Sequence, residues 1–320
     1  MRALHQFVPT FEPGAVGGHM LELQRLARER LGVEAELFAE FVAPAFEGRA
    51  RRHTEYGRRV PARPGDVLMY HMAIGSVVAD FVRGRPEPLV VDHHNVTPPE
   101  MLERWEPGAA YGCSWGRAQL PELASRSVLG VADSPFNEEE LRRAGYAATA
   151  TAPILLDPAF FEAAGDVDER ALAELVEGGA GAEWLFVGRV SPNKCQHDVV
   201  KAFAAYRRVY DPPTRCRRAA DVLVCLSEHE GFCIPLLEAM AHRVPIVAFA
   251  SSAVPGTLGD GGVLLESKAP ATVAAAVHRV LSDPALRDRL VAAGTARLAA
   301  FSPERTRARW TEVLERIGGP

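Results

Sequence analysis

The chain has 320 residues, of which 48% are hydrophobic and 24% are charged, and its formal net charge is -5 at pH 7. This composition excludes a disordered chain, and the acidic balance argues against a general nucleic-acid binder, whose domains are usually basic. The length predicts two domains rather than one.

The cysteines and the apolar runs indicate the cellular compartment of the protein. Five cysteines form no C-x-x-C pair and leave one unpaired in any full disulfide set, which is typical of a protein from a reducing cytosol. No apolar run approaches the ~20 residues of a spanning helix, and the N-terminus reads as a strand rather than a signal peptide. We therefore expect a cytoplasmic protein with at most peripheral membrane contact.

The first elements are a strand over residues 2–8, a loop rich in glycine and proline, and an amphipathic helix from Met20 that ends at Gly32. Gly17 and Gly18 fall in the loop, where glycine lets a ligand approach the backbone closely. The spacing is not G-x-G-x-x-G, so it does not predict a dinucleotide site. An ordinary strand-to-helix turn is the alternative interpretation of each glycine.

A strand over residues 33–39 is followed by an arginine-rich segment, residues 49–63. This segment could form a patch for anionic lipid or for a phosphorylated acceptor. We prefer a solvated surface, because Glu47 and Glu55 interrupt the basic run and no apolar stripe accompanies it.

Two further predicted strands, residues 65–71 and 88–95, end in histidines. The carboxyl ends of parallel strands lie at one edge of a sheet, so His71 and His94 are expected to face the same cleft. His93 and His94 are adjacent and point to opposite faces, so one of them is structural. No cysteine or carboxylate stands at metal-ligand spacing from them, and we predict no metal site.

The first domain is expected to close with two more strand-like segments. Residues 130–141 read as a strand followed by a helix, with Ser134 as the N-cap and Pro135 at the first helical position. Residues 152–158 read as the last strand, and we place the domain boundary at residue 158.

Two motifs in the second half suggest a ligand. Residues 188–194 (G-R-V-S-P-N-K) follow the predicted strand 184–187, and residues 230–238 (E-G-F-C-I-P-L-L-E) follow the strand 221–226 and lead into a helix. Two cations and the free amides of a helix N-terminus attract a phosphate, and carboxylates accept hydrogen bonds from hydroxyls. That combination suits a sugar joined to a phosphate. The alternative is a solvated helix face beside a loop charge.

Together these motifs resemble the nucleotide-sugar half of a retaining glycosyltransferase of the GT-B fold, family 4 (group 1). Residues 92–99 (D-H-H-N-V-T-P-P) and the segment 130–141 are also similar to that family. The resemblance implies an α/β fold class with two facing Rossmann-like domains and parallel sheets. Residues 1–158 would be the acceptor-side domain and residues 159–302 the nucleotide-sugar-binding domain. A C-terminal helix over residues 303–317 would cross back to the first domain through Trp310 and Leu314.

The resemblance also implies the reaction and its residues. A sugar would move from a nucleoside-diphosphate sugar, with retention at the anomeric carbon and without cofactor or metal, to an unknown acceptor that is a sugar, a small molecule or a lipid-linked group. His94 would hold a sugar hydroxyl, Arg189 and Lys194 would neutralise the leaving diphosphate, and Glu230 would hold sugar hydroxyls. The other donor-binding residues implied are Gly17, Gly18, Gly188, Gly231, Phe232, Cys233, Leu237 and Glu238.

The second domain departs from the family in two places. After an expected helix over residues 169–176, only residues 211–220 stand where the family has two strand-helix units, which need roughly 50 residues. Cys233 replaces a usual glycine, and its side chain could narrow the sugar site. A relic that binds a sugar nucleotide or a protein partner without turnover is therefore the alternative. A sugar-nucleotide epimerase is less favoured, because Asp92 is the one obvious acid or base of the first domain.

Overall fold

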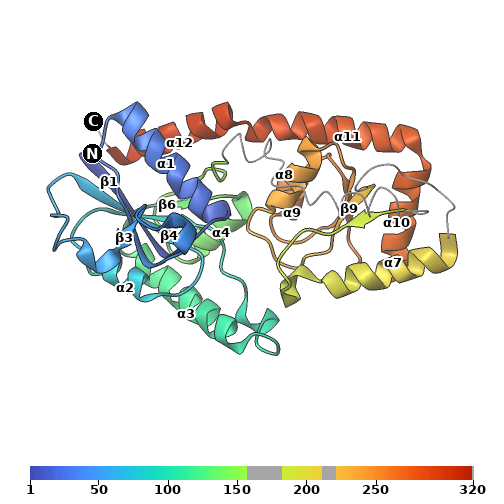
Figure 1. The fold of residues 1–320 in the computed structure, drawn as a ribbon, viewed down its shortest axis with the longest axis horizontal. Coiled ribbons are helices and arrows are strands. Elements are labelled where there is room, and N and C mark those ends of the chain that lie inside the picture. The colour runs from blue at the N-terminus through green and yellow to red at the C-terminus, as the bar shows by residue number, and fades with distance from the viewer. Residues whose placement is uncertain (157–181, 211–220, 319–320) are drawn as a thin grey trace. The chain divides into compact units, whose positions relative to one another are not determined.

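The computed structural model describes residues 1–156, 182–210 and 221–318. The chain divides into two compact units, Met1–Pro158 with Ser302–Pro320 (unit 1) and Ala159–Phe301 (unit 2) (Figure 1). The helix expected over residues 169–176 and the shortened segment 211–220 lie outside the described residues. None of the described helices is long and apolar enough to cross a membrane.

Within the described part of unit 1, seven strands form one parallel sheet in the order β3-β2-β1-β4-β5-β6-β7. The central strands β4 and β5 are buried along their whole length because both faces of the sheet are covered. The strands are β1 (Ala3–Phe11), β2 (Leu37–Val42), β3 (Arg51–Arg52), β4 (Asp66–Met72), β5 (Leu89–His93), β6 (Ser127–Ala132) and β7 (Thr149–Thr151).

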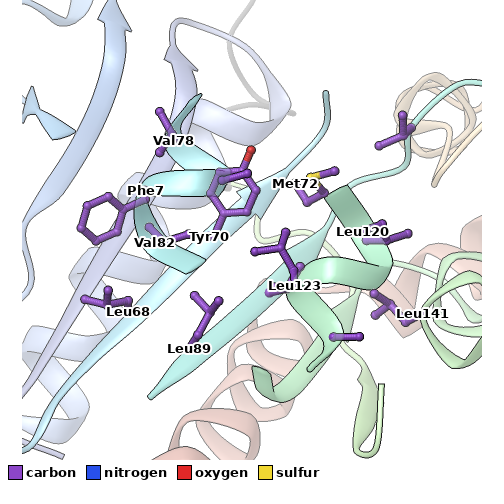
Figure 2. Close-up of a cluster of buried hydrophobic side chains, with 14 of the residues drawn as sticks. Phe7, Leu68, Tyr70, Met72, Val78, Val82, Leu89, Leu120, Leu123 and Leu141 are labelled. Atoms are coloured by element: carbon purple, nitrogen blue, oxygen red, sulfur yellow. The ribbon is translucent and has the colours of Figure 1, made fainter. Parts of the chain in front are cut away.

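Helices cover both faces of this sheet. On one face, α1 and α12 pack Leu23 and Trp310 against Val90 of the sheet. On the other face, α2 and α3 bury Val82 and Leu123 against the sheet, as Figure 2 shows. The helical elements are α1 (Ala15–Leu31), η1 (Pro44–Phe46), η2 (His53–Glu55), α2 (Val77–Arg83), η3 (Pro99–Met101), α3 (Pro107–Ala124), α4 (Pro135–Arg143) and α12 (Pro303–Gly318).

In the described part of unit 2, four parallel strands follow the order β11-β10-β9-β8, with β8 at an edge. The core packs Val224 of β9 against Tyr206 of α7 and Val277 of α10. The elements are β8 (Trp184–Leu185), η4 (Pro192–Lys194), α7 (Gln196–Tyr210), β9 (Val222–Cys225), α8 (Ile234–Ala241), β10 (Ile246–Phe249), α9 (Val254–Leu258), β11 (Val263–Leu265), α10 (Pro270–Ser282), α11 (Pro284–Leu298) and η5 (Ala299–Phe301).

The predicted fold class is confirmed: the chain is α/β, with a parallel sheet in each unit. The Ser134 cap is also observed, since its Oγ accepts the amide of Asn137 at 3.3 Å. The sequence analysis did not predict helix α2, although Ser76 is an N-cap and therefore a start signal for it.

The loop after β1 is shorter than predicted. Helix α1 begins at Ala15, so Gly17 and Gly18 lie in its first turn and not in a loop. A Cβ on Gly17 would come within 2.1 Å of the carbonyl oxygen of Glu12. The chain therefore turns into the helix so tightly that only glycine fits at position 17.

The last strand of the first domain was misplaced. It is β7, before the segment 152–158 in which we expected it. Proline has no amide to donate to a sheet, and the carbonyl of Pro153 instead accepts the indole N–H of Trp310 at 2.8 Å. The amide of Leu155 donates to Nδ1 of His19 at 3.0 Å. Side chains of α12 and α1 therefore hold this segment.

Candidate active site

The two motifs of the second half meet in unit 2. Lys194, at the end of η4, donates a hydrogen bond from Nζ to Oε1 of Glu230 at 2.7 Å. The two side chains are 18% and 10% exposed, so solvent screens this ion pair only partly. Two residues that are 36 positions apart therefore form one charged centre at the carboxyl ends of β8 and β9.

Neighbouring loops hold the backbone on both sides of Glu230. The amide of Glu230 donates to Oγ of Ser252 at 2.7 Å, and Oγ1 of Thr257 donates to the carbonyl of Phe232 at 2.6 Å. From the other side, Nδ2 of Asn193 donates to the carbonyl of His229 at 3.2 Å. Loops after β8, β9 and β10 are thus fixed to one another, which positions the carboxylate before any ligand binds.

Helix α8 begins directly after this loop, with Cys233 as its N-cap. Cys233 has φ 72°, a left-handed conformation that favours glycine, which agrees with the glycine usual in the resembling family. Its buried Sγ lies 3.8 Å from Sγ of Cys225 at the end of β9. The hydrogen bond between the two thiols lowers the pKa of Cys225 to about 7 and raises that of Cys233. Whether this thiol narrows a sugar site stays a prediction.

The remaining predicted donor-binding residues differ in how far they are exposed to solvent. Leu237 is buried on α8, and Glu238 on the same helix is partly exposed, with a pKa raised by burial. Gly188 and Arg189 are exposed in the loop after β8. The structure thus joins Lys194 to Glu230 and leaves Arg189 facing solvent.

A second polar centre lies in unit 1, where three histidines surround Asp92. Oδ2 of Asp92 lies 3.0 Å from Nε2 of His19, 3.2 Å from Nδ1 of His71 and 3.3 Å from Nε2 of His94. Asp92 and His71 are partners in the register of β5 and β4, and His94 follows β5. The sequence predicted that His71 and His94 face one cleft, and the structure brings them into direct contact, with 3.0 Å between Nδ1 of His71 and Nε2 of His94.

Sequence reasoning missed His19 and the central place of Asp92. His19 lies in the first turns of α1, and the available signal was its position in a helix that leaves the carboxyl end of β1. Burial alone would raise the pKa of Asp92, but the charge of His94 and the hydrogen bond from His19 hold it well below its usual range.

His94 is enclosed by this centre, and its side chain is 3% exposed. Its Nε2 faces His71 and Asp92, and its Nδ1 lies 3.6 Å from Oδ2 of Asp133. The neighbouring His93 turns the other way and lies 3.1 Å from Oε2 of Glu140 on α4, as the opposite faces of adjacent strand residues require. Both ring nitrogens of His94 therefore face buried side chains rather than an open cleft.

Comparison with known proteins finds a family match in the second half of the chain. Residues 209–297 match the family model described as glycosyl transferases group 1. A D-inositol 3-phosphate glycosyltransferase from Geodermatophilus obscurus is 46% identical over 92 residues, which are 28% of this chain and 20% of that protein. The O-antigen chain mannosyltransferase B of Escherichia coli is 28% identical over 138 residues, 43% of this chain and 32% of its own. The matches span a third or less of these two relatives.

Solved structures extend the likeness to both units. Sucrose-phosphate synthase from Thermosynechococcus elongatus has a TM-score of 0.70 and 15% identity, with 99% of each chain covered. Anabaena HepE in complex with UDP-glucose has a TM-score of 0.69 and 17% identity, with 97% of this chain and 99% of its own covered. At this identity the likeness concerns the fold, which is GT-B, and the resemblance seen in the sequence is confirmed.

Proposed function

We propose, from the premise that this is a group 1 chain of the GT-B fold, that it transfers a sugar from a nucleoside-diphosphate sugar to an acceptor. The observation that carries the proposal is the Lys194–Glu230 ion pair, which joins the two donor motifs of the second half. A cation and a carboxylate held side by side suit a ligand that has both a diphosphate and sugar hydroxyls.

Each residue of this centre would act on a different part of the donor. Lys194 would neutralise the diphosphate as it leaves, where negative charge develops and a fixed cation lowers the barrier most. Arg189 is exposed on the same loop and would add a second cation. Glu230 would accept hydrogen bonds from sugar hydroxyls, with Gly188 and Gly231 leaving room for the donor beside it.

The start of α8 would complete the phosphate site. The first amides of a helix have no partner within the helix and attract anions, and here they follow Phe232 and Cys233. Farther along the helix, the side chain of Leu237 is buried, and Glu238 would accept hydrogen bonds from the ribose hydroxyls. Retention at the anomeric carbon and independence of metal are part of this proposal because the two donor motifs resemble those of a retaining, metal-independent family.

His94 is not a sugar-binding residue in this proposal, because both of its ring nitrogens face His71, Asp92 and Asp133. Gly17 and Gly18 lie in the first turn of α1 in unit 1, and their role in donor binding stays a prediction. The acceptor stays open, since the relatives named above act on different molecules.

A binding relic without turnover is the second candidate, and one observation favours it. Strand β8 pairs with β9 and forms an edge of the described sheet, and residues 211–220 replace two strand-helix units that would extend this edge. Those units would supply the loop that holds the nucleobase. Donor affinity could therefore persist through the phosphate and sugar contacts without a productive geometry.

A thermal-shift titration with UDP, GDP and ADP tests the proposal, with UDP first because HepE was solved with UDP-glucose. A nucleotide at ~100 times its dissociation constant should add about 2.7 kcal/mol of stability. Lys194→Ala should abolish the shift. Lys201→Ala should keep it, because Lys201 is an exposed lysine of α7 that pairs with Asp198.

Turnover separates the two candidates. Release of UDP from the UDP-sugar in the presence of acceptors, lost in Lys194→Ala, is expected of the transferase. Binding without release supports the relic. No shift with any nucleotide on folded protein rejects donor binding and both candidates that depend on it.

A further inference from the structure

The polar centre of unit 1 contains donor atoms that suit a metal ion. It combines two imidazoles and a carboxylate at the carboxyl ends of adjacent strands, with all donor atoms, including that of His19, within 4.8 Å of one another. Contrary to the sequence-based expectation of no metal site at these histidines, we propose that His71 Nδ1, His94 Nε2 and Asp92 Oδ2 bind a divalent transition-metal ion such as Zn²⁺, and that His19 orients Asp92 from the outer shell. The inference does not depend on the proposed transferase activity.

The spacing of the three ligand atoms fits a tetrahedral ion. Zinc binds histidine nitrogen and carboxylate oxygen at about 2.0–2.1 Å, which places neighbouring ligand atoms of a tetrahedron about 3.3 Å apart. The three separations are 3.0 Å from His71 to His94, 3.2 Å from His71 to Asp92 and 3.3 Å from His94 to Asp92. An ion could enter with adjustments of a few tenths of an ångström.

Hydrogen bonds at the far nitrogen of His71 point its lone pair inward. The amide group of Gln6 donates from Nε2 to the carbonyl of Met20 at 3.0 Å, so its Oε1 must face His71. Nε2 of His71 therefore donates its proton to that oxygen, at 2.9 Å. In a neutral imidazole this leaves Nδ1 as an acceptor beside Oδ2 of Asp92. Two acceptors at 3.2 Å repel unless a cation lies beside them, either a metal ion or a protonated His94.

The far nitrogen of His94 lies near a carboxylate. Its Nδ1 faces the carboxylate of Asp133 at 3.6 Å, which favours a proton on that nitrogen and a lone pair on Nε2. Metal-binding histidines usually donate their other N–H to a carboxylate or an amide oxygen. Gln6 accepts that hydrogen bond from His71, whereas Asp133 lies near Nδ1 of His94 without a hydrogen bond to it among the described residues.

His19 differs from the other two histidines. Its Nδ1 accepts the amide of Leu155, so its Nε2 carries the proton and donates to Asp92 at 3.0 Å. A protonated nitrogen cannot bind a metal, and His19 therefore holds the carboxylate in place. Oδ1 of Asp92 is fully buried and has no hydrogen-bond partner in the part of the chain that the structure describes. It could serve as a further ligand atom, or a water could.

Imidazole and carboxylate ligands suit zinc, iron, cobalt and nickel, and three protein ligands leave a coordination position open. The test is therefore the metal content of the full chain expressed without a histidine tag. We expect one bound ion per chain by plasma mass spectrometry. After removal by a chelator, titration with Co²⁺ should produce the visible absorption of a site with nitrogen and oxygen ligands.

Variants assign the site. His19→Gln should weaken Co²⁺ binding about 10–100-fold, as loss of an outer-shell partner does, and His71→Gln and Asp92→Asn should weaken it by more. His93→Gln is the matched control, because His93 is the buried neighbour of His94 but contacts Glu140, and it should bind Co²⁺ as the wild type does.

Measurements on the wild-type protein alone can reject the proposal, so the test does not depend on whether a variant folds. Absence of bound metal together with absence of Co²⁺ binding would mean that a proton on His94 takes the place of the ion. Equal Co²⁺ binding by folded wild type, His71→Gln and Asp92→Asn would place the metal elsewhere and equally reject it.

Discussion

At the residue scale, burial sets the charge behaviour of Glu238 on α8. The side chain is only partly exposed, and burial raises its pKa above the ordinary value of 4.5, with a smaller opposing contribution from His242. Between 4.5 and the raised value, the folded state binds more protons than the unfolded state. The free energy of unfolding therefore falls as the pH rises through this window, and the penalty persists above it.

We predict that Glu238→Gln stabilises the protein at neutral pH. The amide carries no charge to be desolvated, so its advantage over the carboxylate should be largest above the window and should shrink below pH 4.5. Urea unfolding of both proteins at neutral and at acidic pH measures this difference. Glu266→Gln, on the surface of the same unit, should show no comparable change. An advantage that grows as the pH falls would contradict the prediction.

The same residue bears on function. If Glu238 binds ribose hydroxyls, the glutamine variant should gain stability and lose nucleotide affinity together. Many binding residues are destabilising in the free protein, because they are placed for a ligand rather than for packing.

At the scale of elements, glycines decide how closely the loop after β4 approaches α3. A Cβ on Gly116 of α3 would lie 2.6 Å from the amide nitrogen of Gly75, and a Cβ on Gly75 would lie 2.4 Å from that of Gly116. Two backbones are therefore in direct contact. The amide of Gly75 donates to the carbonyl of Gly112 at 3.0 Å, which fixes the loop on the helix.

We predict that Gly116→Ala destabilises the protein by about 1–3 kcal/mol, the usual cost of forcing atoms into a packed region. Gly108→Ala on the same helix is the control, because nothing lies within 4 Å of its Cβ position. That change should be neutral or stabilise by up to about 1 kcal/mol, since alanine favours a helix over glycine. Chemical unfolding of both variants measures the difference, and similar values for the two would refute the backbone contact.

At the scale of the whole molecule, unit 1 is assembled from both ends of the chain. Helix α12 contributes Trp310, Val313 and Leu314 to the core that α1 and the sheet form, and all three are nearly inaccessible to solvent. The N-terminal amine of Met1 also donates to the carbonyl of Gly318 at 3.1 Å. The N-terminal domain is therefore completed only when the last residues are in place.

Truncation after Phe301 should unfold unit 1, or at least remove the protection of its backbone amides against hydrogen exchange. Removing one large buried side chain costs about 3–5 kcal/mol, and loss of a helix that carries several would exceed the margin of a typical domain, about 5–15 kcal/mol. Hydrogen exchange followed by mass spectrometry should show lost protection in β4 and β5 and retained protection in β9 and β10. A chain that lacks residues 319–320 alone is the control. Full protection of β4 and β5 after truncation would show that α12 is dispensable.

The sequence by itself determined much of this protein. Apolar runs bounded by glycine and proline predicted most strands, Ser134 predicted a helix start, and the residues of the two donor motifs predicted the centre at Lys194 and Glu230. These features depend on local periodicity and on the rule that parallel strands end at one edge, so one sequence is enough to recognise them.

Only the tertiary structure decided the rest. His19 and Asp92 are 73 positions apart, and their meeting depends on how α1 packs on the sheet. The misplaced last strand has the same cause, because Trp310 binds the carbonyl of Pro153 across 157 positions. A local sequence pattern does not show which residues far apart in the chain will be in contact. Their contacts follow from the joint packing of helices and strands, which determines the chemistry of unit 1.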